Sequence, residues 1–271
     1  YRLIMKIKKL LLNPWTALVT LTIMLLVRFW DPSFVESVRL RYFDQLIISQ
    51  PSKDIPVHTV NIDEAALDKY GQFPFPRNIY ADIIKDIYDR NAGLVVFNVL
   101  MPEADRFGQD AKLAQRLERQ AVILPQIAST KGKNKTFGSP VQPVGRDPEG
   151  AFVEYPGIIA NLPALEERAA GVGVANTFPE IDGVVRRMPL LIMAPDRNLV
   201  PLDQQQKVIH PAISLETLRV AIGDSRIQVK IGDEGVEAVR IPKLSKIAVA
   251  PLSRVWIDWS QTPTEHSLAN L

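Results

Sequence analysis

The chain has no cysteine and only three histidines. The lack of cysteine excludes disulfides, zinc–thiolate sites, iron–sulfur clusters and a cysteine nucleophile. His58, His210 and His266 are at neither metal-ligand nor catalytic-triad spacing, and there is no Gly-x-Ser-x-Gly, His-Glu-x-x-His or Walker-type loop. Gly171-Val-Gly173 starts a dinucleotide-type pattern, but the third glycine is missing and a polar turn follows instead of a helix. We therefore expect no catalytic residues, no cofactor and no metal site.

The chain also lacks an excess of charge of one sign, because it has 32 lysines and arginines and 30 aspartates and glutamates. A net charge of +2 is too even for a nucleic-acid-binding protein, which normally carries a basic face, so we expect no nucleic-acid partner. The imbalance is local: Arg2, Lys6, Lys8 and Lys9 lie in the first ten residues without an acidic neighbour. The basic character of the chain therefore lies at its amino terminus.

A hydrophobic run without charge extends from Leu10 to Val27. Its 18 residues would rise about 27 Å as a helix, close to the roughly 30 Å hydrocarbon core of a bilayer. Trp15 and Trp30 stand near its ends, where aromatic rings favour the lipid interface. We expect a retained transmembrane helix over residues 10–30. A signal peptide and a buried helix of a soluble protein are the alternatives; the charged and bulky residues after Val27 do not suit signal peptidase.

Lysine and arginine bias sets the orientation of such a helix. Four basic residues precede it, and only Arg28 follows closely. We therefore expect residues 1–9 to be a cytoplasmic tail and the helix to lie in the inner (cell) membrane. Residues 31–50, which begin with Asp-Pro-Ser, predict a juxtamembrane helix. Residues 51–271 would then form a periplasmic or extracellular domain.

Alternating segments predict an α/β domain in this outer part. Residues 57–62 and 121–127 have strand-like composition, and 93–100 is an almost unbroken apolar run. Such a run is typical of a parallel strand that is covered on both faces. Helical spacing of apolar residues over 79–91, and a helical segment over 110–120, place helices between these strands. We expect a layered α/β domain with a largely parallel central sheet and right-handed crossovers.

Turn-forming residues further along predict an added antiparallel β portion. Residues 173–176 and 183–193 flank the turn at Asp182-Gly183, and we expect them to form two adjacent strands. In the second strand Arg186 and Arg187 point to opposite sides of the sheet. At least one of them must reach a carboxylate or water, since burying an unpaired arginine is costly.

Acidic and amide side chains follow two of the predicted strands. Asp63 comes after the first strand, where it can cap a helix over residues 64–70 that Gly71 ends. Asn98, Glu103 and Asp105 lie in or after the second strand. Because the carboxyl ends of parallel strands converge on a crevice where ligands bind, this crevice is the candidate site.

Arg77 lies at the amino-terminal end of the predicted helix over 79–91, where its positive charge opposes the helix dipole. Either Asp63, Glu64 or Glu103 compensates it internally, or a bound anion does. The cluster is thus either structural, made of caps and an ion pair, or a crevice for a ligand or divalent metal. The candidate ligand-binding residues are Asp63, Glu64, Arg77, Asn98, Glu103, Asp105, Asn176, Asp182, Arg186 and Arg187.

Several motifs, in order and at matching spacing, resemble the CHASE type-two domain, a sensory extracellular domain of bacterial receptors that is associated with cyclases and histidine kinases. The resemblance spans roughly residues 31–271. The segments that carry it are 60–67 (VNIDEAAL), 71–77 (GQFPFPR), 95–105 (VVFNVLMPEAD), 110–114 (DAKLA), 173–176 (GVAN), 182–187 (DGVVRR), 212–216 (AISLE), 255–259 (VWIDW) and 267–271 (SLANL). Two departures are Phe73 and Phe75, where the family usually has tryptophan, and Asn98, where it usually has aspartate.

The resemblance implies an input domain of a transmembrane signalling receptor, with a cyclase or kinase output beyond residue 271. We expect a small ligand of unknown identity, or a homodimer or envelope protein partner, to shift the population of domain arrangements. The domain itself would not be an enzyme. One alternative is a membrane-anchored periplasmic structural subunit of an envelope complex. A third hypothesis is an envelope hydrolase that uses Asp63, Glu103 and Asp105 with a bound divalent cation.

Overall fold

The computed structural model describes residues 13–48, 55–131, 140–146, 150–195, 207–224, 226–261 and 263–271. The chain divides into two compact units. The first unit comprises Tyr1–Ile55, Glu180–Val184 and Asp258–Thr262, and the second comprises Pro56–Pro179, Val185–Ile257 and Pro263–Leu271. Each unit is described separately below.

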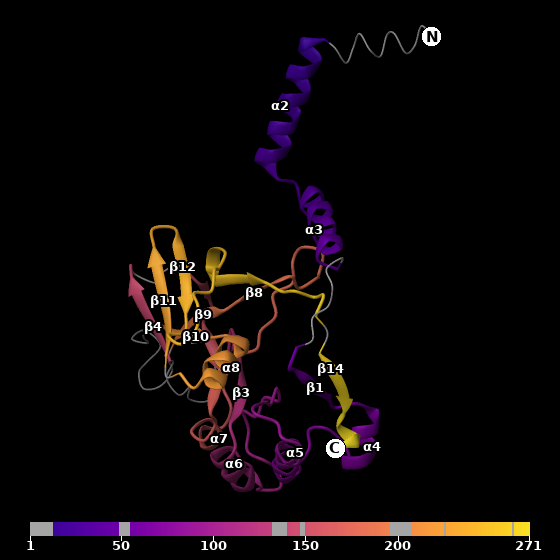
Figure 1. The fold of residues 1–271 in the computed structure, drawn as a ribbon, viewed down its shortest axis with the longest axis vertical. Helices are drawn as coiled ribbons and strands as arrows, with labels where there is room; N and C mark the ends of the chain where they lie inside the picture. The colour runs from indigo at the N-terminus through magenta and orange to yellow at the C-terminus, as the bar shows by residue number, and fades with distance from the viewer. Residues whose placement is uncertain are drawn as a thin grey trace. The chain divides into compact units, whose positions relative to one another are not determined.

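The first unit contains two helices, α2 (Pro14–Trp30) and α3 (Ser33–Ile48), labelled in Figure 1. Asn13 caps the start of α2 by accepting a hydrogen bond from the backbone N–H of Trp15 at 3.0 Å. At the other end Asp31 takes a left-handed conformation, with φ of 38°, and its N–H donates to the carbonyl of Val27. Aspartate tolerates this region better than most residues. The chain therefore turns sharply between the two helices.

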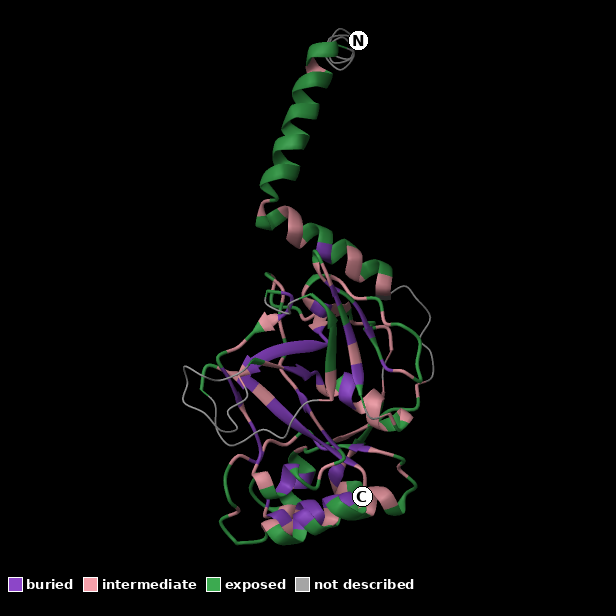
Figure 2. Ribbon diagram, turned by 90° about the vertical axis from the view of Figure 1, so that its left-hand side faces the viewer, coloured by how far each residue is buried: buried purple, intermediate pink, exposed green. Residues whose placement is uncertain are grey.

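Helix α2 has no buried residue, and Figure 2 shows it exposed along its length. No single helix among the described residues is both long enough and apolar enough to cross a membrane. Residues 14–30 and 33–47 meet these criteria only as a pair, and their axes are bent by 86° at the break. Residues 10–12 of the predicted transmembrane segment and 49–50 of the predicted juxtamembrane helix lie outside the described residues.

The second unit is mixed α/β, but it holds several small sheets instead of one central sheet. A four-stranded sheet is built around β3 (Val122–Ser129), which pairs in parallel with β2 (Val95–Val96) and β7 (Gly171–Val174) and antiparallel with β6 (Gly157–Ile159). The expected largely parallel central sheet is thus not formed; parallel pairs are instead spread over several small sheets. The β3 strand is apolar and buried over most of its length, as its neighbours on both edges require.

Helices α5 (Arg77–Asp89) and α6 (Asp110–Arg119) contribute to the core around this sheet. Both are amphipathic: α5 buries Tyr80, Ile83 and Ile84, and α6 buries Leu113 and Leu117. These side chains share one hydrophobic cluster with residues of β2 and β3. The position of the first residue of each helix, Arg77 and Asp110, is therefore fixed by a well-packed core.

The first predicted strand does not join the main sheet. It forms β1 (His58–Asn61), which pairs in parallel with β14 (Thr264–Ser267) in a separate two-stranded sheet. The short helix α4 (Glu64–Tyr70) follows β1, and a 3-10 helix, η3 (Leu268–Asn270), follows β14. The start and the end of the second unit therefore run side by side, a pairing between residues about 200 positions apart.

Three further sheets form the remainder of the second unit. The first joins β10 (Lys207–Pro211), β9 (Leu191–Pro195) and β5 (Val153–Glu154). The second joins β12 (Gly235–Arg240), β11 (Ile227–Gly232) and β4 (Val141–Gly145), and the third joins β13 (Arg254–Trp256) and β8 (Arg187–Pro189). The expected antiparallel pairing of 173–176 with 183–193 is wrong, because β7 pairs with β3 and β8 with β13. The turn at Asp182-Gly183 therefore does not join two paired strands.

Two helices link these sheets. Helix α7 (Pro163–Glu166) is short and follows β6, and α8 (Ile213–Ile222) follows β10. Gly223 ends α8 in the left-handed conformation, with φ of 67°. Figure 2 shows that buried residues concentrate in the strands of the second unit. A second hydrophobic cluster draws its members from β9, β11, β12 and α8.

Candidate functional site

The predicted crevice does not form at one sheet edge, because the two strands that were to build it lie in different sheets. Asp63 follows β1, which pairs with β14, whereas Asn98 follows β2, which pairs with β3. Asp63 is the N-cap of α4 and accepts hydrogen bonds at 3.0 Å from the backbone N–H of Ala66 and from the hydroxyl of Ser267. These two donors lower the pKa of the Asp63 carboxyl. Its role is to cap a helix and to hold the end of β14.

Arg77 is the centre of a second group, at the start of α5. Its side chain is 9% exposed, and the guanidinium donates through Nε to Oδ1 of Asp110 at 3.3 Å. A second donor, Nη2, reaches the backbone carbonyl of Glu103 at 3.2 Å, and the guanidinium carbon lies 5.9 Å from the ring centre of Tyr80. The carboxylate that pairs with Arg77 is thus Asp110, which was not among the three internal candidates Asp63, Glu64 and Glu103.

Asp105 and Asp110 close the loop that carries the acidic residues. The backbone N–H of Asp105 donates to Oδ2 of Asp110 at 2.8 Å, and the N–H of Gln109 donates to Oδ2 of Asp105 at 3.0 Å. Asp110 therefore serves Arg77 with one oxygen and the loop with the other. We name Arg77, Asp105, Asp110 and the carbonyl of Glu103 the Arg77 cluster. Its chemistry is that of a structural clasp that fixes the loop over residues 103–109.

The remaining predicted site residues are dispersed. Glu64, in the first turn of α4, and Asn98 are exposed. The side-chain amide of Asn176 accepts from the backbone N–H of Ala128 at 2.7 Å and donates to its carbonyl at 2.9 Å, so it ties the segment after β7 to the end of β3. Asn176 thus completes a sheet edge.

The turn residues fall in both units. Asp182 belongs to the first unit, where its Oδ1 accepts from the N–H of Val184 at 3.2 Å. Arg186 and Arg187 belong to the second unit. Arg186 is buried, and the guanidinium of Arg187 lies 5.0 Å from the ring centre of Trp256 on the paired strand β13. A cation over an aromatic face is a favourable arrangement for an arginine that is half-buried.

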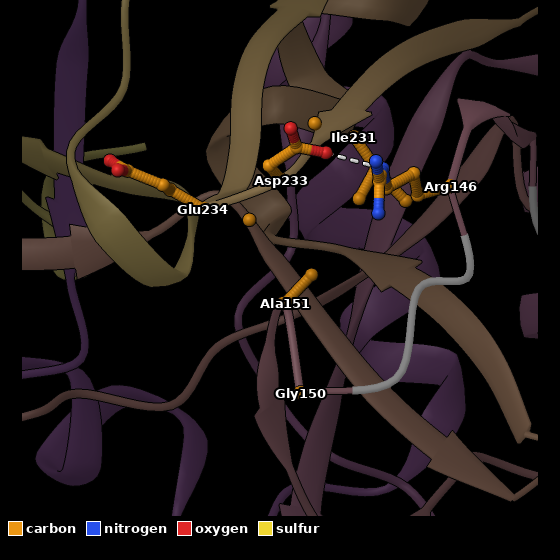
Figure 3. A pocket seen from close by; sticks show the side chains of 8 residues that line it. Arg146, Gly150, Ala151, Ile231, Asp233 and Glu234 are labelled. Atoms are coloured by element: carbon orange, nitrogen blue, oxygen red, sulfur yellow. Dashed lines mark ion pairs between the residues drawn. The ribbon is translucent and has the colours of Figure 1, made fainter.

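Two hollows lie elsewhere, at the turn between β11 and β12. They measure about 590 Å³ and 480 Å³, and both are lined by Asp233, Glu234 and Gly235. Figure 3 shows the first hollow, where Arg146 forms an ion pair with Asp233 while Glu234 extends away from that pair. No residue of the predicted crevice lines either hollow. Among the described residues, no group of three or more histidine, aspartate or glutamate side chains could hold a metal ion.

The structure contains a buried polar network around Glu166 that the sequence analysis did not predict. Glu166, at the end of α7, is 3% exposed and accepts from the backbone N–H and the side-chain amide of Asn161, at 2.8 and 3.1 Å. Gln126 of β3 donates to both of its carboxylate oxygens at 3.2 Å. Asn161 in turn donates to the carbonyl of Pro125 and accepts from the N–H of Met101. The one available signal was Gln126, a polar residue inside an apolar strand.

Replacement of Arg77 by alanine tests the structural role of the Arg77 cluster. It removes the cation that pairs with Asp110 and the Nη2 donor to the carbonyl of Glu103, so we expect a loss of about 1–3 kcal/mol in the free energy of unfolding. The loop over residues 103–109 should then be cut faster by a protease. Urea unfolding and limited proteolysis of R77A measure these effects. Arg119→Ala, at the exposed end of α6, is the matched control and should stay within about 0.5 kcal/mol. Equal unfolding midpoints for the two variants would contradict the clasp.

Comparison with known proteins places these features in one family. The model of the CHASE2 domain family matches residues 18–271, which is nearly the whole chain. No curated protein and no solved structure is significantly similar to it. The matched region includes most of α2, all of α3 and the whole second unit. The resemblance to this family is thereby confirmed, and the match begins earlier in the chain, at residue 18, than the expected residue 31.

Proposed function

The chain belongs to the CHASE2 domain family of sensory domains, and from this premise we propose that it is the extracytoplasmic input domain of a bacterial transmembrane receptor. In this proposal the second unit receives the stimulus outside the cell membrane. The domain does no chemistry itself, and the output is a cyclase or kinase in the same receptor.

The observation that carries the proposal is the exposed apolar surface of α2. None of its 17 residues is buried, and its large apolar side chains, from Trp15 to Trp30, are exposed on every side. A helix that is hydrophobic all round needs an apolar environment, which is either a protein core or a bilayer. The 17 residues of α2 rise about 26 Å, close to the roughly 30 Å hydrocarbon core of a bilayer. The basic residues at the amino terminus support an orientation with that end in the cytoplasm.

The pairing of β1 with β14 supports a route for the signal. In the sequence β1 comes shortly after α3, and β14 lies close to residue 271. Three side chains tie residues 267–271 to α4 and to the end of α5. Asp63 binds Ser267, Lys69 donates to the carbonyl of Ala269 at 2.8 Å, and Arg90 donates to the carbonyl of Leu271 at 2.5 Å. A stimulus that changes the packing of the second unit would act on both chain segments together, which is what a population shift requires.

A topology measurement tests the proposal. We expect alkaline phosphatase fused after residue 271 to be active in bacteria, because it folds only outside the cytoplasm. A fluorescent protein that folds only in the cytoplasm should be dark at the same position. The control lacks residues 10–30, and it should reverse both readouts. A second variant with Arg2, Lys6, Lys8 and Lys9 replaced by alanine should lower phosphatase activity by weakening the orientation signal. Cytoplasmic fluorescence of the intact fusion would overturn the proposal.

A further inference from the structure

Helix α3 carries a stripe of exposed apolar side chains. Phe34, Val38, Tyr42 and Leu46 are four residues apart, and between 50 and 71% of each residue is exposed. Side chains at this spacing follow one another along a single helix face. We propose that this stripe rests on the outer surface of the membrane, so that α3 lies flat among the phospholipid headgroups. The inference rests on the proposed function, because it requires α2 to span the bilayer.

Helix α3 buries apolar residues on its opposite face, so the exposed stripe is not the face that contributes to the core. Leu40 is 3% exposed, and Phe43 and Ile47 are half-buried. The helix is therefore apolar on two faces, of which one is covered and the other is open. A contiguous apolar patch that stays open on a protein surface usually marks an interaction site.

The geometry of the first unit matches a helix that lies in the membrane plane. The axes of α2 and α3 are bent by 86°, so an α2 that follows the membrane normal makes α3 nearly parallel to the surface. Asp31 in the left-handed conformation and Pro32 fix this bend within two residues. At the bend Phe29 and Trp30 are almost fully exposed, as interfacial aromatic residues are.

The charges on the open side of α3 favour phospholipid over a second copy of the chain. Arg39 and Arg41 are exposed beside the stripe, and Arg28 stands at the end of α2. Arg39 pairs with Asp31 and Glu36, while Arg41 pairs with no described carboxylate. A two-fold contact between copies would bring these arginines together, whereas lipid phosphates complement them. Interfacial helices combine such basic residues with large apolar ones.

Single-cysteine spin labels can test the proposal directly, because the natural chain contains no cysteine. The full chain carrying Val38→Cys or Leu46→Cys would be labelled and reconstituted into vesicles of phosphatidylcholine and phosphatidylglycerol. We expect each label to be severalfold more accessible to oxygen, which enters lipid, than to a water-soluble nickel chelate. Val144→Cys on β4, exposed in the second unit, is the control and should show the reverse.

A third label separates this inference from the proposed function. Met24 lies in the middle of α2, so a label at Met24→Cys should have the oxygen accessibility of the bilayer core. If Met24→Cys is in lipid but Val38→Cys and Leu46→Cys are in water, the interfacial placement is overturned and the receptor proposal survives. If all three labels are in water, both fail. Spin–spin broadening at Val38→Cys or Leu46→Cys that disappears on dilution with unlabelled protein would assign the stripe to a second copy and would also overturn the placement.

Discussion

Gly173→Ala is expected to destabilise the second unit by about 3 kcal/mol or more, one of the largest effects of any single substitution that adds one methyl group. A Cβ at this position would lie 2.8 Å from the backbone N of Ile213 and 3.1 Å from the carbonyl carbon of Ala212, and closer still to the Cα of Ile213. All three atoms are backbone, so no rotamer change can relieve the contact. Helix α8 would have to move off β7.

Denaturant unfolding of the full chain in detergent, followed by far-ultraviolet circular dichroism, measures this loss. The matched control is Gly93→Ala, because nothing lies within 4 Å of a Cβ at Gly93 and its backbone is not left-handed. We expect the control to be neutral or slightly stabilising, by up to about 1 kcal/mol, through the reduced entropy of the unfolded chain. Equal unfolding midpoints for G173A and G93A would show that α8 does not rest on β7.

Gly171 lies two residues earlier on the same strand face, and its effect should be smaller. A Cβ there would meet the side chain of Glu216, which is flexible but is held by two hydrogen bonds to Arg219 at 2.6 and 2.8 Å. The two glycines therefore explain the pattern that the sequence offered as an incomplete dinucleotide fingerprint. They allow helix α8 to approach strand β7 closely. The pattern alone did not distinguish close packing from ligand binding.

Local signals predicted the elements well, because caps and turns act over a few residues. Helix α4 starts after Asp63 and stops before Gly71, as expected. Gly71 has a positive φ of 92°. The Phe-Pro-Phe-Pro-Arg segment bends at residues 72–74, where the Phe73–Pro74 peptide bond is cis, and its Phe75 is buried against Tyr80, whose hydroxyl accepts from the N–H of Phe75 at 3.0 Å. Burial raises the pKa of that hydroxyl. This segment thus belongs to the core and fixes the start of α5.

Pairing between distant segments could not be predicted in the same way. Nothing in residues 58–61 identifies residues 264–267 as their partner, and the choice of β14 over β2 moved Asp63 away from Asn98. The carboxylate that pairs with Arg77 could not be predicted either, because the candidates are distant from it in the sequence. Glu103 is 26 residues away and Asp110 is 33, and both follow β2. Asp110 is the first residue of α6, and the packing of α5 against α6 brings its carboxylate to Arg77.

The buried carboxylate of Glu166 leads to the second large effect. It accepts hydrogen bonds from two amide side chains and one backbone N–H, and no described lysine, arginine or histidine pairs with it. Glu166→Ala would leave the donors of Gln126 and Asn161 without an acceptor inside the protein. Each buried donor without a partner costs about 1–3 kcal/mol, so we expect a loss of about 3 kcal/mol. Glu167→Ala, at the exposed neighbouring residue, is the control and should change little.

The same carboxylate makes stability depend on pH. Burial raises the pKa of Glu166, so the folded protein holds its proton at a pH where the unfolded chain has released it. The stabilisation from this group is fully present below the pKa of glutamate in the unfolded chain, and it is lost as the pH rises through the folded pKa. Glu166→Gln removes the titration. The unfolding free energy of E166Q relative to the natural chain should therefore rise between acidic and neutral pH, as denaturant midpoints across that range can measure. A difference that stays constant or falls with pH would mean that Glu166 is ionised in the fold and that its three donors outweigh its burial.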